Sequence, residues 1–232
     1  MEFSPEGPKA IPLWVNGRAF LTVTESFFDV VNPHSGEAVH RVPLCGAAEA
    51  AEAAGAARAA QPAWAALAPE ARQACLDALA DGLDRYTGHF VKLLRGDTGF
   101  PEAQAQGEVA AALAALRGTA VGEAGVVALV VDATRPLAGF AEAAASILRA
   151  GGAVIVKPSP KAPAAAFALC ELSGRAAWPP GVLNLMQGDT EAIDGLCCGG
   201  IDRLVYAGNA ALGVQVGAIA DAAGKPYVML AS

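Results

Sequence analysis

The second half of the chain alternates short apolar runs with Ala-rich helical stretches. Val126–Val131 is a continuous apolar run of strand length, which suits a strand covered on both faces. Similar units recur toward the end of the chain. The expected strands are Val126–Val131, Ala153–Val156, Val182–Leu185, Arg203–Tyr206 and Tyr227–Leu230, and the expected helices are Leu137–Arg149, Pro163–Ala176, Thr190–Leu196 and Ala210–Ala223. This alternation predicts right-handed crossovers and an α/β fold with a parallel sheet of about five strands.

The first half follows other patterns. From Leu13 to Leu44, short apolar runs are separated by turns such as Asn16-Gly17, which predicts two or three antiparallel strands joined by hairpins. Further helices are expected over Ala47–Ala60, Pro69–Tyr86 and about Glu102–Arg117, with the first two packed together. We expect one domain over residues 1–232, with a β and helical segment at 13–117 and the strand–helix units at 125–232.

The bulk composition narrows the class of partner. The chain has 232 residues, a hydrophobic content of 54 % and a formal net charge of −7, with no run of Lys or Arg. It is therefore large enough to bury a core, and neither nucleic acid nor an anionic membrane is expected as a partner. The segment Met1–Ala10 lacks the features of a secretory signal, and no apolar run reaches the roughly 18 residues of a membrane span. We expect a cytoplasmic protein.

Metal binding is not expected. The five cysteines, Cys45, Cys75, Cys170, Cys197 and Cys198, lack paired CxxC spacing, and the three histidines are scattered along the chain. Buried, reduced thiols are the favoured interpretation; an exposed, oxidisable Cys197-Cys198 pair is the alternative.

Two features favour a nucleotide site. Lys157 ends the expected strand Ala153–Val156, where a basic side chain is well placed for a ribose or a phosphate. The stretch Gly208–Gly213 has the pattern Gly-x-x-x-x-Gly and can present helix N-terminal amides to a pyrophosphate. The alternative is that the two glycines only permit a tight turn and close packing.

The chain resembles the NAD(P)-dependent aldehyde dehydrogenases. The segments that carry the resemblance are Trp14-Val15-Asn16-Gly17, Val31-Asn32-Pro33-His34-Ser35-Gly36-Glu37, Gly125-Val126-Val127, Pro136-Leu137, Lys157-Pro158-Ser159, Pro179-Pro180-Gly181-Val182-Leu183-Asn184 and Gly208–Gly213. They follow the family's order and cover nearly the whole chain. The resemblance implies a Rossmann-like sheet with an N-terminal β-hairpin and helical segment. It also implies a chain truncated to the N-terminal, NAD(P)-binding half and lacking the catalytic domain.

The resemblance assigns cofactor-binding roles to Lys157, Ser159, Gly208 and Gly213. Pro160 stands where the family has a Glu that accepts the ribose hydroxyls, so half of that clamp remains. Whether NAD or NADP binds, and whether either still binds, is left open by these residues.

The resemblance assigns no catalytic residue. Thr134 stands where the family's Thr-Pro-Trp-Asn-Phe-Pro turn has the oxyanion-binding Asn, and Leu230 stands where its Leu-Glu-Leu-Gly-Gly stretch has the general-base Glu. No cysteine lies in the family's nucleophile context. The family's oligomerisation hairpin also has no room between Arg117 and Gly125.

The favoured hypothesis is a non-catalytic member, a pseudoenzyme that acts as a scaffold, assembly or regulatory partner. It would bind a protein, or itself, through the surface that faces the catalytic domain in the family. One alternative is an NAD(P)-dependent aldehyde oxidoreductase component of a split or multi-subunit enzyme. The other is a dinucleotide-binding sensor.

Overall fold

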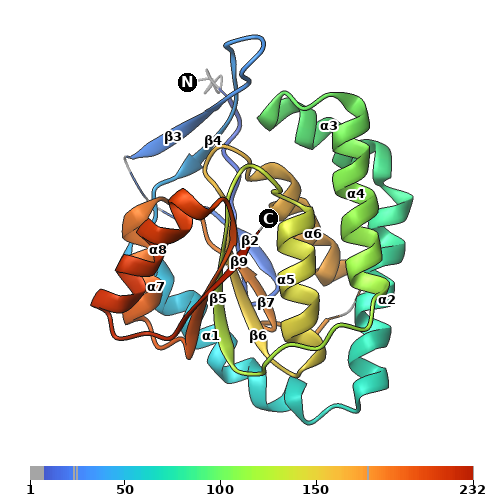
Figure 1. Ribbon diagram of the computed structural model, residues 1–232, viewed down its shortest axis with the longest axis vertical. Coiled ribbons are helices and arrows are strands. Elements are labelled where there is room, and N and C mark those ends of the chain that lie inside the picture. Colours follow the sequence, from blue (N-terminus) through green and yellow to red (C-terminus); the bar gives the residue numbers. More distant parts are fainter. Residues whose placement is uncertain (1–7, 23, 25, 177, 232) are drawn as a thin grey trace, which may run out of the picture.

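A central sheet with helices on both faces makes up most of the molecule, and a β-ribbon projects from one end (Figure 1). The computed structural model describes residues 8–22, 24, 26–176 and 178–231. The first seven residues, in which no secretory signal is expected, lie outside the described part, as does Ser232.

Five strands of the main sheet are parallel. They are β5 (Val126–Val131), β6 (Ala153–Lys157), β7 (Leu183–Leu185), β8 (Arg203–Gly208) and β9 (Tyr227–Ala231), in the spatial order β7-β6-β5-β8-β9. The expected α/β fold with about five parallel strands is therefore confirmed. The chain adds β6 and β7 on one side of β5 and then crosses back to place β8 on the other side. The strand order thus reverses between β5 and β8.

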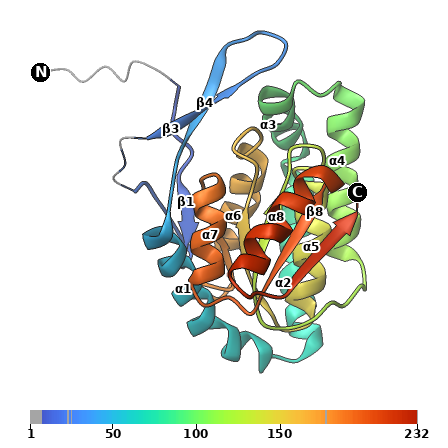
Figure 2. The same cartoon turned by 60° about the vertical axis from the view of Figure 1, so that its left-hand side comes forward.

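The N-terminal segment extends this sheet. Strand β1 (Leu13–Val15) pairs antiparallel with β7 through Trp14 and Leu185, and β2 (Arg18–Phe20) pairs with β1, so the sheet has seven strands. Strands β3 (Phe27–Val31) and β4 (Ala38–Pro43) form a separate two-stranded ribbon that stands away from the main sheet (Figure 2). The opening thus contains four strands in two hairpins, one more strand than expected.

Eight helices lie in the described part of the chain. They are α1 (Ala47–Ala65), α2 (Pro69–Arg85), α3 (Thr87–Thr98), α4 (Glu102–Arg117), α5 (Ala138–Arg149), α6 (Ala164–Arg175), α7 (Thr190–Cys198) and α8 (Ala210–Ala222). Helix α3 was not expected from the sequence; the others were. None of these helices is long and apolar enough to cross a membrane.

The helices divide between the two faces of the sheet. Alternate residues of β5 enter two different clusters, with Val127 and Leu129 facing α2, α4, α5 and α6, and Val126 and Ala128 facing α1, α7 and α8. Both faces of β5 are buried, as the unbroken apolar run predicts. Helices α1 and α2 contact each other at the end of α1, where Trp64 joins the cluster of the α2 leucines and Arg72 donates to the Ala65 carbonyl. The alanine face of α1 approaches the sheet beside α7, whereas the leucine stripe of α2 packs on the opposite face.

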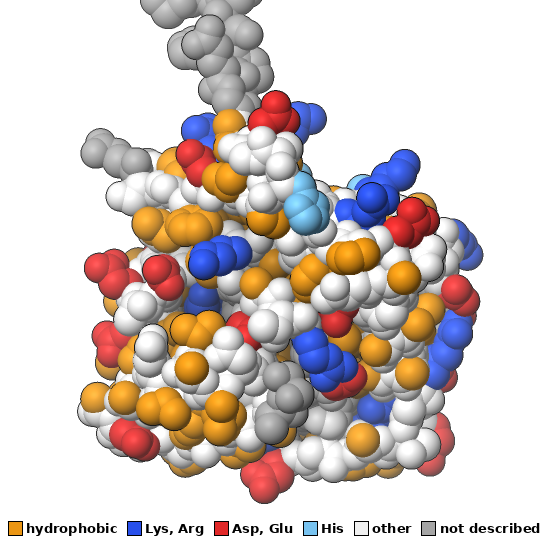
Figure 3. Space-filling view, turned by 45° about the horizontal axis from the view of Figure 1, so that its top comes forward, with side chains coloured by type: hydrophobic (Ala, Val, Ile, Leu, Met, Phe, Trp, Pro, Cys, Tyr) orange, Lys and Arg blue, Asp and Glu red, His pale blue; other side chains and the backbone are white. Residues whose placement is uncertain are grey.

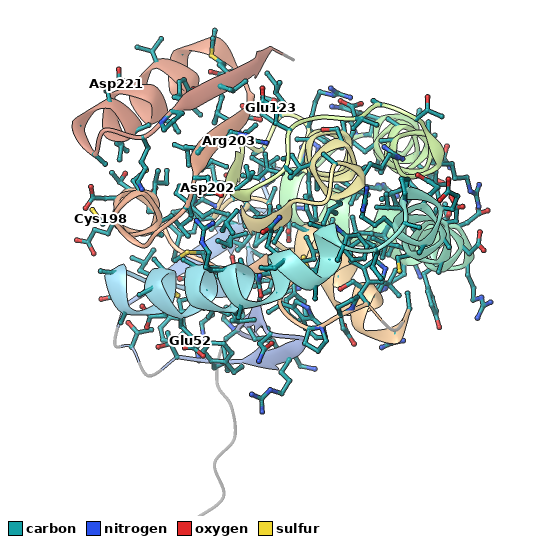
Figure 4. All side chains as sticks on the ribbon, turned by 90° about the horizontal axis from the view of Figure 1, so that it is seen from below. Glu52, Glu123, Cys198, Asp202, Arg203 and Asp221 are labelled. Carbon is teal, nitrogen blue, oxygen red and sulfur yellow. The ribbon has the colours of Figure 1, made fainter. Side chains whose placement is uncertain are left out.

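Charged groups hold the amino-terminal edge of the sheet. The Asp202 carboxylate accepts a hydrogen bond from the Val126 amide at 2.7 Å. It also forms an ion pair with Arg58 at 2.6 Å. The next residue, Arg203, donates to the Ala124 carbonyl at 2.8 Å, and Figure 4 shows Asp202 and Arg203 together at this edge, near Glu123. Asp202 therefore fixes where β5 begins relative to β8.

A buried carboxylate ties the β-ribbon to the helical layer. Asp97, 3 % exposed, accepts a hydrogen bond from the Ala164 amide at the start of α6 at 2.8 Å. Its other oxygen lies 3.0 Å from Nδ1 of His40 on β4. One side chain thus caps a helix and orients the ribbon.

Replacing this carboxylate tests its contribution. Asp97→Ala leaves the buried Ala164 amide without its acceptor, so the free energy of unfolding should fall by about 1–3 kcal/mol. Glu102→Ala is the control, because its ion pair with Arg95 joins side chains that are 63 % and 50 % exposed. It should change stability by less than about 0.5 kcal/mol. Urea unfolding measures both, and equal losses would contradict the assigned role of Asp97.

Candidate functional site

A cavity of about 430 Å³ opens at the carboxyl ends of β5, β6 and β8. It lies where the strand order reverses, which is where open α/β sheets bind ligands. Its walls come from α7, α8, the three strand ends and the β-ribbon. Figure 3 shows this end of the molecule, with the surface hollowed between the ribbon and α8.

Lys157 forms part of the cavity wall. It is the last residue of β6 and is only 3 % exposed. Its ammonium group donates to the Gly188 carbonyl at 2.8 Å and to the Pro158 carbonyl at 3.0 Å. Burial lowers the pKa of Lys157 from 10.5 to about 8, and the Asp189 carboxylate opposes that effect. An ammonium has three N–H donors, so one remains for a ligand in the cavity.

Asp132 is the second buried charge at the cavity. It follows β5 directly, and its side chain is fixed by four hydrogen bonds. Oδ1 accepts from the Thr134 amide at 2.8 Å and from the Thr134 hydroxyl at 2.5 Å. Oδ2 accepts from the Asn209 amide at 2.7 Å and from the Tyr206 hydroxyl at 3.2 Å. One carboxylate therefore joins the end of β5 to β8 and to the start of α8.

The tyrosine in this network is held as a donor. Tyr206 is 1 % exposed. Burial, and then the charge of Asp132, raise the pKa of its hydroxyl well above the ordinary value. The phenol therefore keeps its proton and its hydrogen bond to the carboxylate near neutral pH.

Of the four residues expected to bind a cofactor, two line the cavity and two are packed against neighbouring side chains. Lys157 and Ser159 are in the wall, and the Ser159 hydroxyl accepts a hydrogen bond from the Lys161 amide at 3.2 Å. A Cβ at Gly208 would overlap the Asp132 carboxyl group, and one at Gly213 would overlap the Met229 sulfur. Both glycines thus have the close-packing role that was the alternative interpretation. A role for any of the four in cofactor binding stays a prediction.

Two backbone amides at the start of α8 already have acceptors within the chain. Asn209 is the N-cap, and its side chain accepts a hydrogen bond from the Leu212 amide at 3.0 Å. Its own amide donates to Asp132. Negative charge is stabilising at a helix N-terminus, and other proteins bind anions there. In this chain the Asp132 carboxylate takes that position.

The cavity wall is electrically balanced and partly apolar. Lys157 and Lys161 face Asp132 and Asp189, so the formal charges cancel. The apolar part is formed by Ile193 of α7 together with Val130, Leu212, Val216 and Ile219. Within the described residues, no group of three His, Cys, Asp or Glu side chains is arranged to hold a metal ion.

Sequence reasoning missed Asp132, Asn209 and the apolar face shared by α7 and α8. An acidic residue directly after the first parallel strand was the available signal for Asp132. Its partners lie 74 and 77 positions further along the chain. Their approach depends on the pairing of β5 with β8, which local periodicity does not reveal.

A model of the aldehyde dehydrogenase family matches residues 20–124 and 122–231. Glutarate-semialdehyde dehydrogenase of Pseudomonas putida is 28 % identical over 228 residues, covering 88 % of this chain and 48 % of that enzyme. The chain therefore spans about half the length of the curated relatives it matches.

Two solved structures are similar in fold. Lactaldehyde dehydrogenase from Escherichia coli has a TM-score of 0.89 and 23 % identity, over 96 % of this chain and 52 % of that one. Indole-3-acetaldehyde dehydrogenase of P. syringae, in complex with NAD+ and IAA, has a TM-score of 0.86 and 25 % identity, over 95 % of this chain and 50 % of that one.

The buried ammonium makes stability depend on pH. The pKa of Lys157 is about 8 in the folded protein, against 10.5 for an ordinary lysine, so between these values the unfolded chain holds more protons. The penalty for burying the charge is therefore fully present below pH 8 and is relieved as pH rises through this window. Relative to Lys157→Met, the wild-type free energy of unfolding should rise by about 3 kcal/mol between pH 8 and pH 10.5.

Urea unfolding at a series of pH values measures this difference. Lys161→Met is the control, because Lys161 is exposed at the rim of the same cavity, and its difference from wild type should stay flat. A flat difference for Lys157→Met as well would contradict the burial of a charged ammonium.

Proposed function

The chain belongs to the aldehyde dehydrogenase family, and on that premise we propose that it is a non-catalytic member that binds another protein through strand β9. Its role is that of a scaffold, assembly or regulatory partner. The single observation that carries the proposal is the exposed apolar edge formed by β9.

The positions that the resemblance assigns to catalysis are unsuited to it. Thr134 stands at the oxyanion-binding position, and its hydroxyl proton is already donated to Asp132 at 2.5 Å. Leu230 stands at the position of the general base, and a hydrocarbon side chain transfers no proton. These two replacements support a loss of catalysis from residues within the chain itself.

The thiols give further support. Burial raises the pKa of Cys45 to about 12 and that of Cys197 to about 11, and it raises the pKa of Cys75 and Cys170 as well. Thiols with raised pKa values are poor nucleophiles near neutral pH. Cys198 is exposed, but it ends α7 and so lies far along that helix from the cavity, at the edge seen in Figure 4.

Strand β9 forms an open edge of the main sheet. Within the described residues it pairs only with β8, and Val228, Met229 and Leu230 are 44 %, 41 % and 41 % exposed. Val228 and Leu230 pair with Val205 and Ala207, whose side chains belong to the core on the α5 side. Three consecutive apolar residues are thus exposed, so neither face of this strand is fully covered.

Helix α8 extends the apolar surface. Leu212 and Val214 are 45 % and 69 % exposed, and the buried Gly213 between them lies against Met229. Figure 3 shows hydrophobic side chains gathered over this part of the molecule. An unpaired strand with apolar side chains favours strand addition by a partner, because the partner supplies both main-chain hydrogen bonds and apolar contact.

The partner we propose is a polypeptide that covers β9 as the remaining part of a longer relative would. The relatives are about twice the length that this chain spans, which supports such an occupant. A second copy of this chain is the competing occupant. Sedimentation of the purified chain distinguishes it from a different polypeptide.

The alternative of a split aldehyde oxidoreductase requires that the partner bring the base and the oxyanion donor as well as the nucleophile. Thr134 and Leu230 weigh against it. The alternative of a dinucleotide sensor is favoured by Lys157 and by the cavity at the strand ends. It concerns the cavity, which shares Leu212 with the apolar surface formed by β9 and α8.

A charged residue on β9 tests the proposal. Leu230→Lys should weaken association with the partner by at least about tenfold, because a desolvated ammonium would face an apolar interface. Leu67→Lys is the matched control, since Leu67 is 37 % exposed in the turn between α1 and α2. Quantitative co-purification from the native host measures retention of the partner, and sedimentation equilibrium measures self-association.

A complex that Leu67→Lys retains and Leu230→Lys loses would support the proposal. If sedimentation shows that loss for the purified chain alone, the occupant is a second copy. Equal behaviour of the wild type and both variants in both measurements would contradict a role for β9.

A further inference from the structure

Among the residues that line the cavity at the strand ends, none belongs to β9. We propose that Asp132 is a specificity-determining residue, which makes this cavity select an uncharged, nucleoside-like ligand and reject a pyrophosphate. This preference follows from the positions of two buried charges, from the start of α8 and from the shape of the apolar wall.

The attractive group is Lys157. Two of its N–H donors are held by the Gly188 and Pro158 carbonyls, so the direction of its ammonium group is set. Among the described residues it has no third acceptor, and it lies in the cavity wall. A buried donor of this kind favours an oxygen acceptor on the ligand, and a hydroxyl or ether oxygen meets that need without adding charge.

The repulsive group is Asp132. Its four hydrogen bonds hold the carboxylate beside the Asn209 amide, so it cannot turn away when a ligand enters. The Gly208 backbone lies directly against it, which blocks retreat in that direction. A phosphate placed at the start of α8 would meet a fixed negative charge in a partly desolvated site. Repulsion between the phosphate and the Asp132 carboxylate would strongly disfavour binding.

The helix itself offers less to an anion than its position suggests. The Asn209 amide is bonded to Asp132, and the Leu212 amide is bonded to the Asn209 side chain. The positive end of the α8 dipole is therefore met by the chain's own carboxylate. A pyrophosphate would have to displace Asp132 to gain the Asn209 amide.

The rest of the wall suits a flat, uncharged group. Ile193 on α7 and Val216 and Ile219 on α8 line the cavity between these two helices, and Ile193 and Val216 are each 6 % exposed. The volume of about 430 Å³ lies within the range of small-molecule sites. A planar base would pack against this apolar wall, and the hydroxyl groups of a sugar joined to that base would reach Lys157. A nucleoside has both parts.

The probes are adenosine, AMP, ADP and NAD+, which share one nucleoside and differ in negative charge. By isothermal titration calorimetry, wild-type protein should bind adenosine at least about tenfold more tightly than ADP or NAD+. ADP or NAD+ binding as tightly as adenosine, or no adenosine binding at all, would overturn the proposal. These measurements need no variant.

Asp132→Asn removes the charge and keeps a side chain of the same shape. It should raise the affinity for ADP by at least about tenfold and change the affinity for adenosine by less than about twofold. Asp221→Asn is the control, because it removes the same charge from the exposed far end of α8, seen in Figure 4. It should alter neither affinity.

Three results with the variants would overturn the proposal. One is an equal gain for ADP and adenosine in Asp132→Asn. Another is the same response in Asp132→Asn and Asp221→Asn. The third is adenosine binding that survives Lys157→Met unchanged. Circular dichroism verifies that each variant is folded, and if Asp132→Asn does not fold, the wild-type ligand series decides alone.

Discussion

The bonds made by one carboxylate govern the functional end of this protein. Asp132 lies where the strand order reverses, and it joins the end of β5 to Tyr206 on β8 and to Asn209 at the start of α8. Neighbouring features depend on this junction. Gly208 lacks a side chain where the carboxylate lies, and Tyr206 is buried with its hydroxyl proton retained. The Asp132 side chain is therefore held in one orientation at this junction.

The hydrogen bonds that stabilise this junction also occupy donors that a ligand could otherwise use. The Thr134 hydroxyl donates its proton to the Asp132 carboxylate. The Asn209 amide, which otherwise would attract an anion, is also bonded to the carboxylate. Lys157 remains the one buried donor in the described cavity wall that has bonding capacity to offer a ligand. We therefore infer a protein that keeps the fold of its family and uses its surfaces for binding.

Local pattern in the sequence was sufficient for the parallel sheet. The run Val126–Val131 has the same bounds in the structure, because a strand buried on both faces leaves an unambiguous apolar signature. Helix α3 was missed: Gly88 and Gly96 obscure it, although Phe90, Val91 and Leu94 have helical spacing. The pairing of Trp14 with Leu185, and of Asp132 with Tyr206, joins distant positions, and such contacts follow from topology rather than from local composition.

We infer that this chain does not catalyse aldehyde oxidation. The most direct measurement is cofactor reduction, followed by absorbance, with purified protein, NAD+ or NADP+, and the semialdehydes of its relatives, beside a full-length relative as positive control. We expect no reduction above the protein-free rate, because neither Thr134 nor Leu230 can perform the steps required of those positions. Aldehyde-dependent reduction that disappears in Lys157→Met would contradict the account.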